Sequence, residues 1–267
     1  MRIFEILRLF VWVHIINVMV DCSTVFNVQV SARVEDFLTD YLTLMSRSIF
    51  GPYNTVIDKN IQLNLSNPID TSRKILFQTR QTFKETSNIY VALENGLFYG
   101  YVAHNFQVDI ANVPKRYSSV YTVNSDGSPG QYLSNLTYDH RTRPWYMQIK
   151  KARAPTWTSI YLSTTTGASE FNFGVPLFVN NSDPKSDFIG CISGALFLSD
   201  FTTFLERAYQ NTSISVFIVD QSTGELIAST LGIPVNTRSS KGVLVIQVKV
   251  SDTLIMTCYI LVLFSMF

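Results

Sequence analysis

Apolar residues recur at helical spacing in the first third of the chain. Between Val30 and Phe50 they fall three and four residues apart with charged residues among them, which predicts a long amphipathic helix over 30–50. Gly51-Pro52 follows and is expected to end it. A second helical pattern covers residues 71–86. The N-terminal region is therefore expected to be helical.

From residue 88 onward the pattern changes to short apolar runs and alternation with a period of two, which is typical of strands. The predicted strands are 89–93, 97–102, 117–123, 157–164, 171–179, 188–197, 213–220, 225–229 and 242–250. Short helices are expected at 144–151 and 200–209. The predicted fold class is α+β. A long helix is followed by antiparallel-sheet modules, and after the first module the same pattern of elements starts a second time.

Both ends of the chain are apolar. The run over residues 9–20 follows a basic start and is shorter than the roughly 20 residues of a bilayer span, so residues 1–22 are predicted to be a signal peptide or a signal anchor. A buried N-terminal helix is the alternative. Residues 253–267 also stop short of a span. A truncated transmembrane segment, a final buried strand and a short tail anchor stay open there, and we favour the first.

Four Asn-x-Ser/Thr triplets agree with export, because they are acceptors for N-linked glycans. They begin at Asn64, Asn135, Asn180 and Asn211, all in polar segments that we expect to be loops. The three cysteines are scattered and form no readable disulfide framework. The three histidines are isolated, so a metal site is not expected. The sequence favours a luminal or extracellular domain of the secretory pathway.

The composition excludes several function classes. The chain has 267 residues, of which 46% are hydrophobic and 15% charged, so it can build one large core or two ordinary ones. Its formal net charge of +1 gives no field that favours nucleic acid. The sequence has no phosphate-cradling loop and no Gly-x-Ser-x-Gly elbow. We expect neither an enzyme nor a cofactor in this chain, although a kinase or cyclase effector could lie outside it.

The densest candidate binding chemistry lies between residues 138 and 161. A fixed cation stands there among aromatic side chains, at Tyr138, Arg143, Trp145, Tyr146 and Tyr161. A guanidinium can form a charge-assisted, bidentate pair with a carboxylate, and aromatic rings supply apolar walls. The cluster predicts a small organic anion or zwitterion as ligand. Alternatively, Arg143 caps a helix or pairs with Asp139, and the aromatic residues belong to the core.

Several of these motifs resemble one protein family. They are Arg143-Pro144-Trp145-Tyr146, Trp157-x-x-x-Tyr161, Gly174-Val175-Pro176-Leu177 and Ile189-Gly190-Cys191-Ile192-Ser193-Gly194. Over about residues 30–230 the chain resembles the double Cache sensor domains, which are extracellular PAS-like modules. The resemblance implies a stalk helix at 30–50, a membrane-distal module with the ligand pocket at 51–200, and a partial membrane-proximal module at 201–250.

The resemblance also implies roles for single residues. Tyr138, Arg143, Trp145, Tyr146 and Tyr161 match the pattern of the amino-acid-binding members, in which the arginine binds the ligand carboxylate. The two aspartates that would hold the ammonium group fall on Ser163 and Ala195. A buried ammonium without a counter-charge is costly. We therefore expect a ligand with a carboxylate, or another small metabolite, rather than a free α-amino acid.

These implications predict the extracellular sensing domain of a transmembrane receptor at the plasma membrane. The terminal apolar segments would attach it to the membrane, and a homodimer would form through the stalk helix. The alternative function is an accessory or interaction module, similar to calcium-channel auxiliary subunits, that binds no small ligand.

Overall fold

The computed structural model describes twelve stretches of the chain. They are residues 12–15, 24–58, 68–83, 88–102, 105–109, 117–163, 167–209, 215–220, 226–231, 236–238, 244–246 and 259–264. The chain divides into two compact units. We call Thr43–Ser159 with Phe171–Leu196 the sheet unit. We call Met1–Leu42, Ile160–Glu170 and Phe197–Phe267 the terminal unit.

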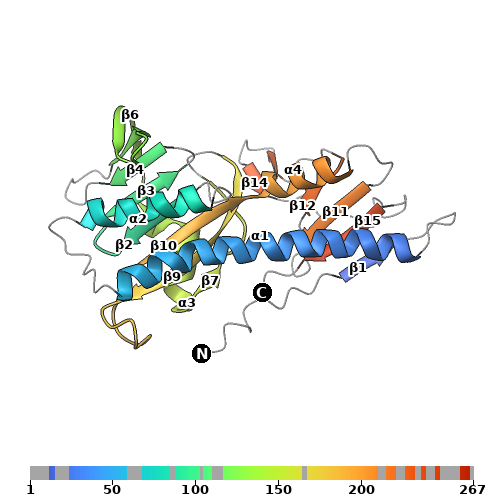
Figure 1. The fold of residues 1–267 in the computed structure, drawn as a ribbon, viewed down its shortest axis with the longest axis horizontal. Helices are drawn as coiled ribbons and strands as arrows, with labels where there is room; N and C mark the ends of the chain where they lie inside the picture. Colours follow the sequence, from blue (N-terminus) through green and yellow to red (C-terminus); the bar gives the residue numbers. More distant parts are fainter. Residues whose placement is uncertain are drawn as a thin grey trace. The chain divides into compact units, whose positions relative to one another are not determined.

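A large antiparallel sheet forms the centre of the sheet unit (Figure 1). Its strands follow the order β6-β5-β4-β3-β2-β10-β9-β7. Their bounds are β2 Asn88–Leu93, β3 Phe98–Val102, β4 Asn105–Asp109, β5 Tyr117–Val123, β6 Pro129–Thr137, β7 Thr156–Trp157, β9 Ser169–Phe178 and β10 Phe188–Phe197. Strands β2 and β9 are buried along their whole length, which explains their continuous apolar runs. The predicted α+β class is confirmed.

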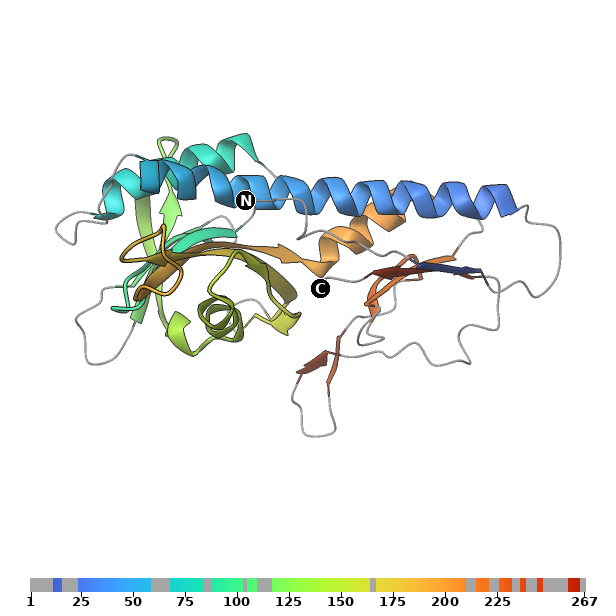
Figure 2. The ribbon, with the colours of Figure 1, turned by 90° about the horizontal axis from the view of Figure 1, so that it is seen from below.

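Helices cover both faces of this sheet (Figure 2). Helix α2 (Pro68–Thr82) and the part of helix α1 (Thr24–Asp58) from Thr43 onward lie over one face, and α3 (Pro144–Ala152) lies over the other. Two glycines allow close packing. A Cβ at Gly194 would come within 2.5 Å of Met45 in α1, and one at Gly174 within 2.1 Å of Ile149 in α3. The sheet can approach both helices because these positions lack side chains.

Helix α1 continues past the residues that were predicted to end it. The prediction ended it at residue 50, but it continues through Pro52 to Asp58. Proline removes one backbone donor and displaces one carbonyl, which kinks or breaks an exposed helix. Here the surrounding turns pack, since Ile49 is fully buried and the ring of Phe50 lies 5.6 Å from that of Phe173. Tertiary packing outweighs the local signal.

Two strands of the sheet, β4 and β6, were not predicted. Strand β6 is mostly exposed and lies at the edge, so it has no apolar face to reveal it.

Asn135, predicted to lie in a loop, lies in strand β6, although its side chain is exposed. Asn180 lies in the turn after β9, as expected. Asn64 and Asn211 are outside the described residues.

The predicted strand over 157–164 is interrupted. It is divided into β7 and the two-residue strand β8 (Tyr161–Leu162), and each pairs with a different part of β9. Between them, the backbone N–H of Thr158 donates to the carbonyl of Asn172 at 2.8 Å. The backbone N–H of Asn172 in turn donates to the Thr158 hydroxyl at 2.9 Å.

The terminal unit contains the first part of α1, helix α4 (Leu198–Tyr209) and a small sheet. The sheet order is β1-β15-β11-β12, with bounds Trp12–Ile15, Tyr259–Phe264, Ser215–Asp220 and Leu226–Ser229. A separate ribbon pairs β13 (Asn236–Arg238) with β14 (Leu244–Ile246). The ring of Phe37 stacks on that of Phe204 at 3.5 Å, and Tyr41 donates to Asp200 Oδ2 at 2.9 Å. These contacts hold α4 against α1.

Part of the apolar C-terminal segment, Tyr259–Phe264, forms strand β15. Strand β15 pairs in parallel with β11 and antiparallel with β1. For Tyr259–Phe264 this agrees with the strand alternative, because pairing with β11 satisfies backbone groups that an isolated apolar run would leave without partners. The truncated transmembrane segment over 253–267 stays a prediction. Within the first 22 residues the structure describes only Trp12–Ile15, as strand β1. Across the described residues, no helix is long and apolar enough to span a membrane.

Candidate functional site

The segment from Asp139 to Pro144 positions the candidate cation. Asp139 caps the short 3-10 helix His140–Thr142 by accepting a hydrogen bond from the backbone N–H of Arg141 at 3.1 Å. Arg143 then occupies the N-cap of α3 with an extended backbone, and Pro144 follows at the first helical position. The Arg143 side chain makes no capping hydrogen bond within the described part of the chain. Side-chain capping is therefore not the role of Arg143.

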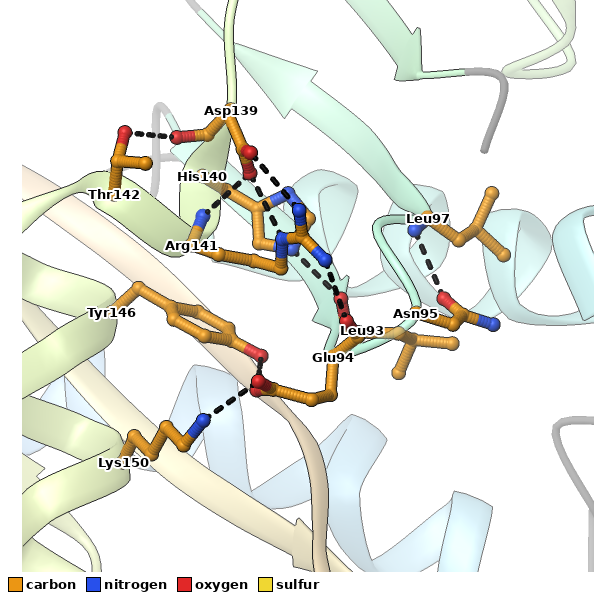
Figure 3. Close-up of polar contacts among 10 residues, drawn as sticks. All are labelled: Leu93, Glu94, Asn95, Leu97, Asp139, His140, Arg141, Thr142, Tyr146 and Lys150. Carbon is orange, nitrogen blue, oxygen red and sulfur yellow. Dashed lines mark hydrogen bonds and ion pairs between the residues drawn. The ribbon is translucent and has the colours of Figure 1, made fainter. Parts of the chain in front are cut away.

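Arg141, and not Arg143, pairs with Asp139 (Figure 3). The Arg141 guanidinium donates to both oxygens of the Asp139 carboxylate, each at 3.1 Å. Its third contact is a 3.1 Å hydrogen bond to the backbone carbonyl of Glu94. The hydrogen bond with Asp139 raises the pKa of Arg141 above its ordinary value. Arg141 thus has a carboxylate and a backbone carbonyl as partners within the protein.

Arg143 is half-buried, and its contacts differ from those of Arg141. Its guanidinium lies over the ring of Tyr138, 4.8 Å from the centroid, and that ring packs edge-on against Phe98 at 5.4 Å. Its Nε is buried and has no hydrogen-bond partner among the described residues. No carboxylate in that part of the chain forms an ion pair with it. One face of the cation is covered by an aromatic ring, and a buried in-plane donor is left without an acceptor in the described part of the chain.

Trp145 and Tyr146 are core residues, with exposed fractions of 2% and 1%. Trp145 packs against Tyr90 at 5.1 Å between ring centroids. Tyr146 contacts His140 at 5.0 Å and Phe188 at 5.7 Å. These rings fix α3 on the sheet, as the alternative interpretation proposed. Direct ligand contact by either ring stays a prediction.

Glu94, in the turn between β2 and β3, ties that turn to α3 (Figure 3). Its carboxylate accepts hydrogen bonds from Tyr146 Oη at 2.9 Å and from Lys150 Nζ at 2.6 Å. Burial alone would raise the pKa of Glu94, but the hydrogen bonds from Lys150 and Tyr146 and the nearby positive charges lower it. Burial also raises the pKa of the Tyr146 phenol, which stays a neutral donor. The network holds the start of α3, and with it Arg143, in place.

Removing the Tyr146 hydroxyl should weaken this network modestly. We expect Tyr146→Phe to lower the free energy of unfolding by about 1 kcal/mol, because a charge-assisted hydrogen bond is lost while the ring keeps its packing. Urea denaturation measures the change. Tyr132→Phe is the matched control, since Tyr132 is 50% exposed and should change stability by less than about 0.5 kcal/mol. Equal stability of the two variants would show that the bond to Glu94 contributes nothing.

The remaining predicted site residues fall in different places. Ala195 lies in β10 of the sheet unit, 1% exposed and opposite Asn88. Tyr161 and Ser163 belong to the terminal unit, where Tyr161 lies opposite Glu170 in the β8–β9 pair. Ser163 is buried at 6% exposure. The structure therefore groups Tyr138, Arg143, Trp145 and Tyr146 on one segment and Tyr161 with Ser163 on another.

Sequence reasoning missed Glu170. Its side chain is 7% exposed, and its carboxylate accepts a 2.8 Å hydrogen bond from the Tyr161 hydroxyl. The Ser163 side chain is also hydrogen-bonded to it. Burial raises the pKa of Glu170 from 4.5 to about 7, and the two hydrogen bonds offset only part of that rise. A lone charged residue directly before the apolar run of β9 was the available signal.

A buried polar cluster in the middle of the sheet was also missed. The Asn172 amide donates to the Tyr90 hydroxyl and, at 3.1 Å, to Ser193 Oγ. Ser193 Oγ donates to the carbonyl of Phe173 at 3.0 Å. Asn172 and Ser193 are fully buried. The cluster satisfies its own polar groups within the core, which is a structural role.

Solved structures similar to this chain are ligand-binding domains of bacterial chemoreceptors. PctC of Pseudomonas aeruginosa PAO1, in complex with GABA, is 14% identical, with 77% of this chain and 76% of that chain covered at a TM-score of 0.49. Tlp3 of Campylobacter jejuni, in complex with L-valine, is 15% identical over 77% and 68% at a TM-score of 0.48. Mlp24 with asparagine is 16% identical over 78% and 75% at a TM-score of 0.40.

These domains are double Cache sensors, the family that the sequence motifs of this chain resemble. No protein-family model and no curated protein matches the chain.

Across the described residues, no three His, Cys, Asp or Glu side chains gather in a way that could hold a metal ion. Cys191 is buried in β10, and burial raises the pKa of its thiol, which disfavours the reactive thiolate.

Proposed function

We propose that this chain is a small-ligand-sensing domain in which Arg143 binds a carboxylate or other anionic group of a small organic molecule. The observation that carries the proposal is the difference between two neighbouring arginines. Arg141 uses its donors on Asp139 and on a backbone carbonyl, whereas Arg143 has a buried Nε without a partner in the described part of the chain.

The energetics favour an anion at Arg143. A buried donor without a hydrogen bond costs about 1–3 kcal/mol, which a bidentate carboxylate would recover. The stack on Tyr138 covers one face of the guanidinium and leaves its in-plane donors for the ligand. The contacts of Glu94 with Tyr146 and Lys150 fix the start of α3 before any ligand arrives. Such preorganisation lowers the entropy cost of binding.

The proposed place of this domain is the extracellular side of a membrane receptor. Asn135 and Asn180 support it, because both are exposed, as acceptors of N-linked glycans must be. The signal sequence over 1–22, membrane attachment and a homodimer through α1 belong to the same proposal. The division into a ligand-binding module at 51–200 and a partial second module at 201–250 belongs to it as well.

Calorimetry with matched acid and amide pairs tests this function. The panel contains the common L-amino acids, GABA and C3–C6 monocarboxylic acids, each measured beside its primary amide, which keeps the shape and removes the negative charge. We expect at least one acid to bind, with its amide at least about tenfold weaker, because a charge-assisted pair is lost. Equal affinity for the amide, or binding by no member of the panel, would overturn the proposal. The second outcome would favour the interaction-module alternative.

A further inference from the structure

A pair of tyrosines lies exposed at the open edge of the large sheet. Strand β6 is the edge strand and is paired on one side, with β5 (Figure 1). Tyr132 of β6 is 50% exposed, and its ring packs edge-on against that of Tyr121 in β5 at 5.7 Å between centroids. Apolar surface at an open strand edge is either a contact surface or a liability that proteins keep covered.

A shift in strand register places Asn135 on the same face as Tyr132. Side chains three residues apart on a regular strand point to opposite faces. Here Ser119 of β5 lies opposite Asn135, and two residues later Tyr121 lies opposite Tyr132, so β6 has one extra residue between these pairs. Ser119 and Tyr121 share a face because they are two residues apart in β5. Their partners on β6 therefore share that face as well.

A side-chain contact orients the Asn135 amide. Ser119 Oγ donates to Asn135 Oδ1 at 3.0 Å. Asn135 is exposed, and its Nδ2, the atom that carries an N-linked glycan, makes no hydrogen bond within the described part of the chain. The tyrosine pair lies two residues further along the strands, at a distance of about 7 Å. The first sugar on Asn135 would therefore begin next to the two rings.

We propose that the first N-acetylglucosamine of a glycan on Asn135 packs on the Tyr121–Tyr132 pair. One face of a pyranose ring consists of C–H groups, which the negative face of an aromatic ring attracts, and the contact removes apolar surface from water. The sugar also hinders other chains from pairing with the edge strand β6. The inference rests on the extracellular location within the proposed function and is independent of the ligand site at Arg143.

Chemical modification of Tyr132 tests the contact directly. The full chain is secreted from eukaryotic cells, and an endoglycosidase trims each glycan to one N-acetylglucosamine. Peptide mass spectrometry should find this sugar on Asn135. Thr137→Val removes the acceptor motif and keeps Asn135 with its contact to Ser119. Tetranitromethane should nitrate Tyr132 at least about threefold more slowly in the glycosylated wild type than in Thr137→Val, since the sugar covers a ring that is otherwise half exposed.

A thermal double-mutant cycle measures the same contact as stability. Thr137→Val should lower the melting temperature by about 2–4 °C in the wild-type background, and by less than about 1 °C in Tyr132→Thr, which has no ring for the sugar. Threonine suits a strand, so Tyr132→Thr keeps the edge intact. Ser182→Ala is the matched control, because it removes the acceptor motif at Asn180, in the turn after β9. Its effect should be equal in both backgrounds.

Four outcomes would overturn the proposal. Asn135 without a sugar, while Asn180 carries one, is the first. Equal nitration of Tyr132 in the wild type and Thr137→Val is the second, and it decides even if Tyr132→Thr is not secreted. The third is an equal loss of melting temperature in both backgrounds. If neither asparagine carries a sugar, the extracellular location falls as well, while calorimetry with the acid panel still decides on ligand binding through Arg143.

Discussion

Arg143→Ala is expected to weaken binding of the sensed acid by about a hundredfold and to leave the fold intact. The bidentate, charge-assisted contact with a carboxylate is worth about 1.5–3 kcal/mol, and every 1.4 kcal/mol is a factor of ten in affinity. The loss to stability should stay below about 1 kcal/mol, because the described contact that disappears is the stack on Tyr138. Calorimetry with the best acid of the panel measures the first effect, and urea denaturation the second.

Arg143→Lys separates charge from geometry. Lysine keeps the positive charge but loses the planar fork that matches a carboxylate with two parallel hydrogen bonds. We expect this variant to bind the acid about tenfold more weakly than the wild type, between the wild type and Arg143→Ala. If it binds as tightly as the wild type, the site needs only a positive charge and no bidentate contact.

Arg141→Ala is the matched control, with the same residue type two positions earlier. It removes the pair with Asp139 and the hydrogen bond to the Glu94 carbonyl, so stability should fall by about 1 kcal/mol. Affinity for the acid should change by less than about threefold, because Arg141 uses its donors inside the protein. The opposite pattern, in which Arg141→Ala removes binding and Arg143→Ala only destabilises, would exchange the roles of the two arginines and refute the assignment.

The elements that sequence reasoning predicted correctly are those with local signals. The hairpin of β2 and β3 has Gly96 at its turn with φ of 96°, a conformation that glycine adopts without strain. Helix α3 begins at Pro144, whose ring suits the first helical position. Such signals depend on a few neighbouring residues, and tertiary packing does not override them here.

The missed elements depend on partners far along the chain. Strand β15 pairs with β11, more than 40 residues earlier, and no local pattern distinguishes that strand from a short apolar anchor. Strand β6 is held by its backbone pairing with β5 and shows little apolar alternation. In both, pairing of distant strands supplies the stabilisation, which a single sequence does not display.

The candidate site also combines features with a local sequence signal and features that depend on contacts between distant residues. The sequence identified Arg143 within an aromatic cluster, but two arginines follow the possible partner Asp139, at spacings of two and four residues. Only the structure shows that Arg141 takes it. Glu170 was missed because the comparison with the family considered Ser163 and Ala195 alone. The antiparallel β8–β9 pair brings residue 170 opposite residue 161, a relation that spacing along the chain did not reveal.

Glu170→Gln is expected to stabilise the ligand-free protein at pH 8 by about 3 kcal/mol. Burial raises the pKa of Glu170 from 4.5 to about 7, so the folded protein holds its proton more tightly than the unfolded chain does. Each unit of pKa difference corresponds to about 1.4 kcal/mol. The stability that Glu170 contributes is therefore fully present below about pH 4.5 and is lost as the pH rises to about 7. Glutamine carries no charge and escapes this loss.

Urea denaturation at pH 4, 5.5, 7 and 8 tests the sign and the pH range together. The difference in unfolding free energy between Glu170→Gln and the wild type should be close to zero at pH 4, near half its final value at about pH 5.7, and complete above pH 7. Glu206→Gln should show no such trend, because its carboxylate is exposed. A difference that does not depend on pH would mean that Glu170 is already ionised and compensated in the folded protein.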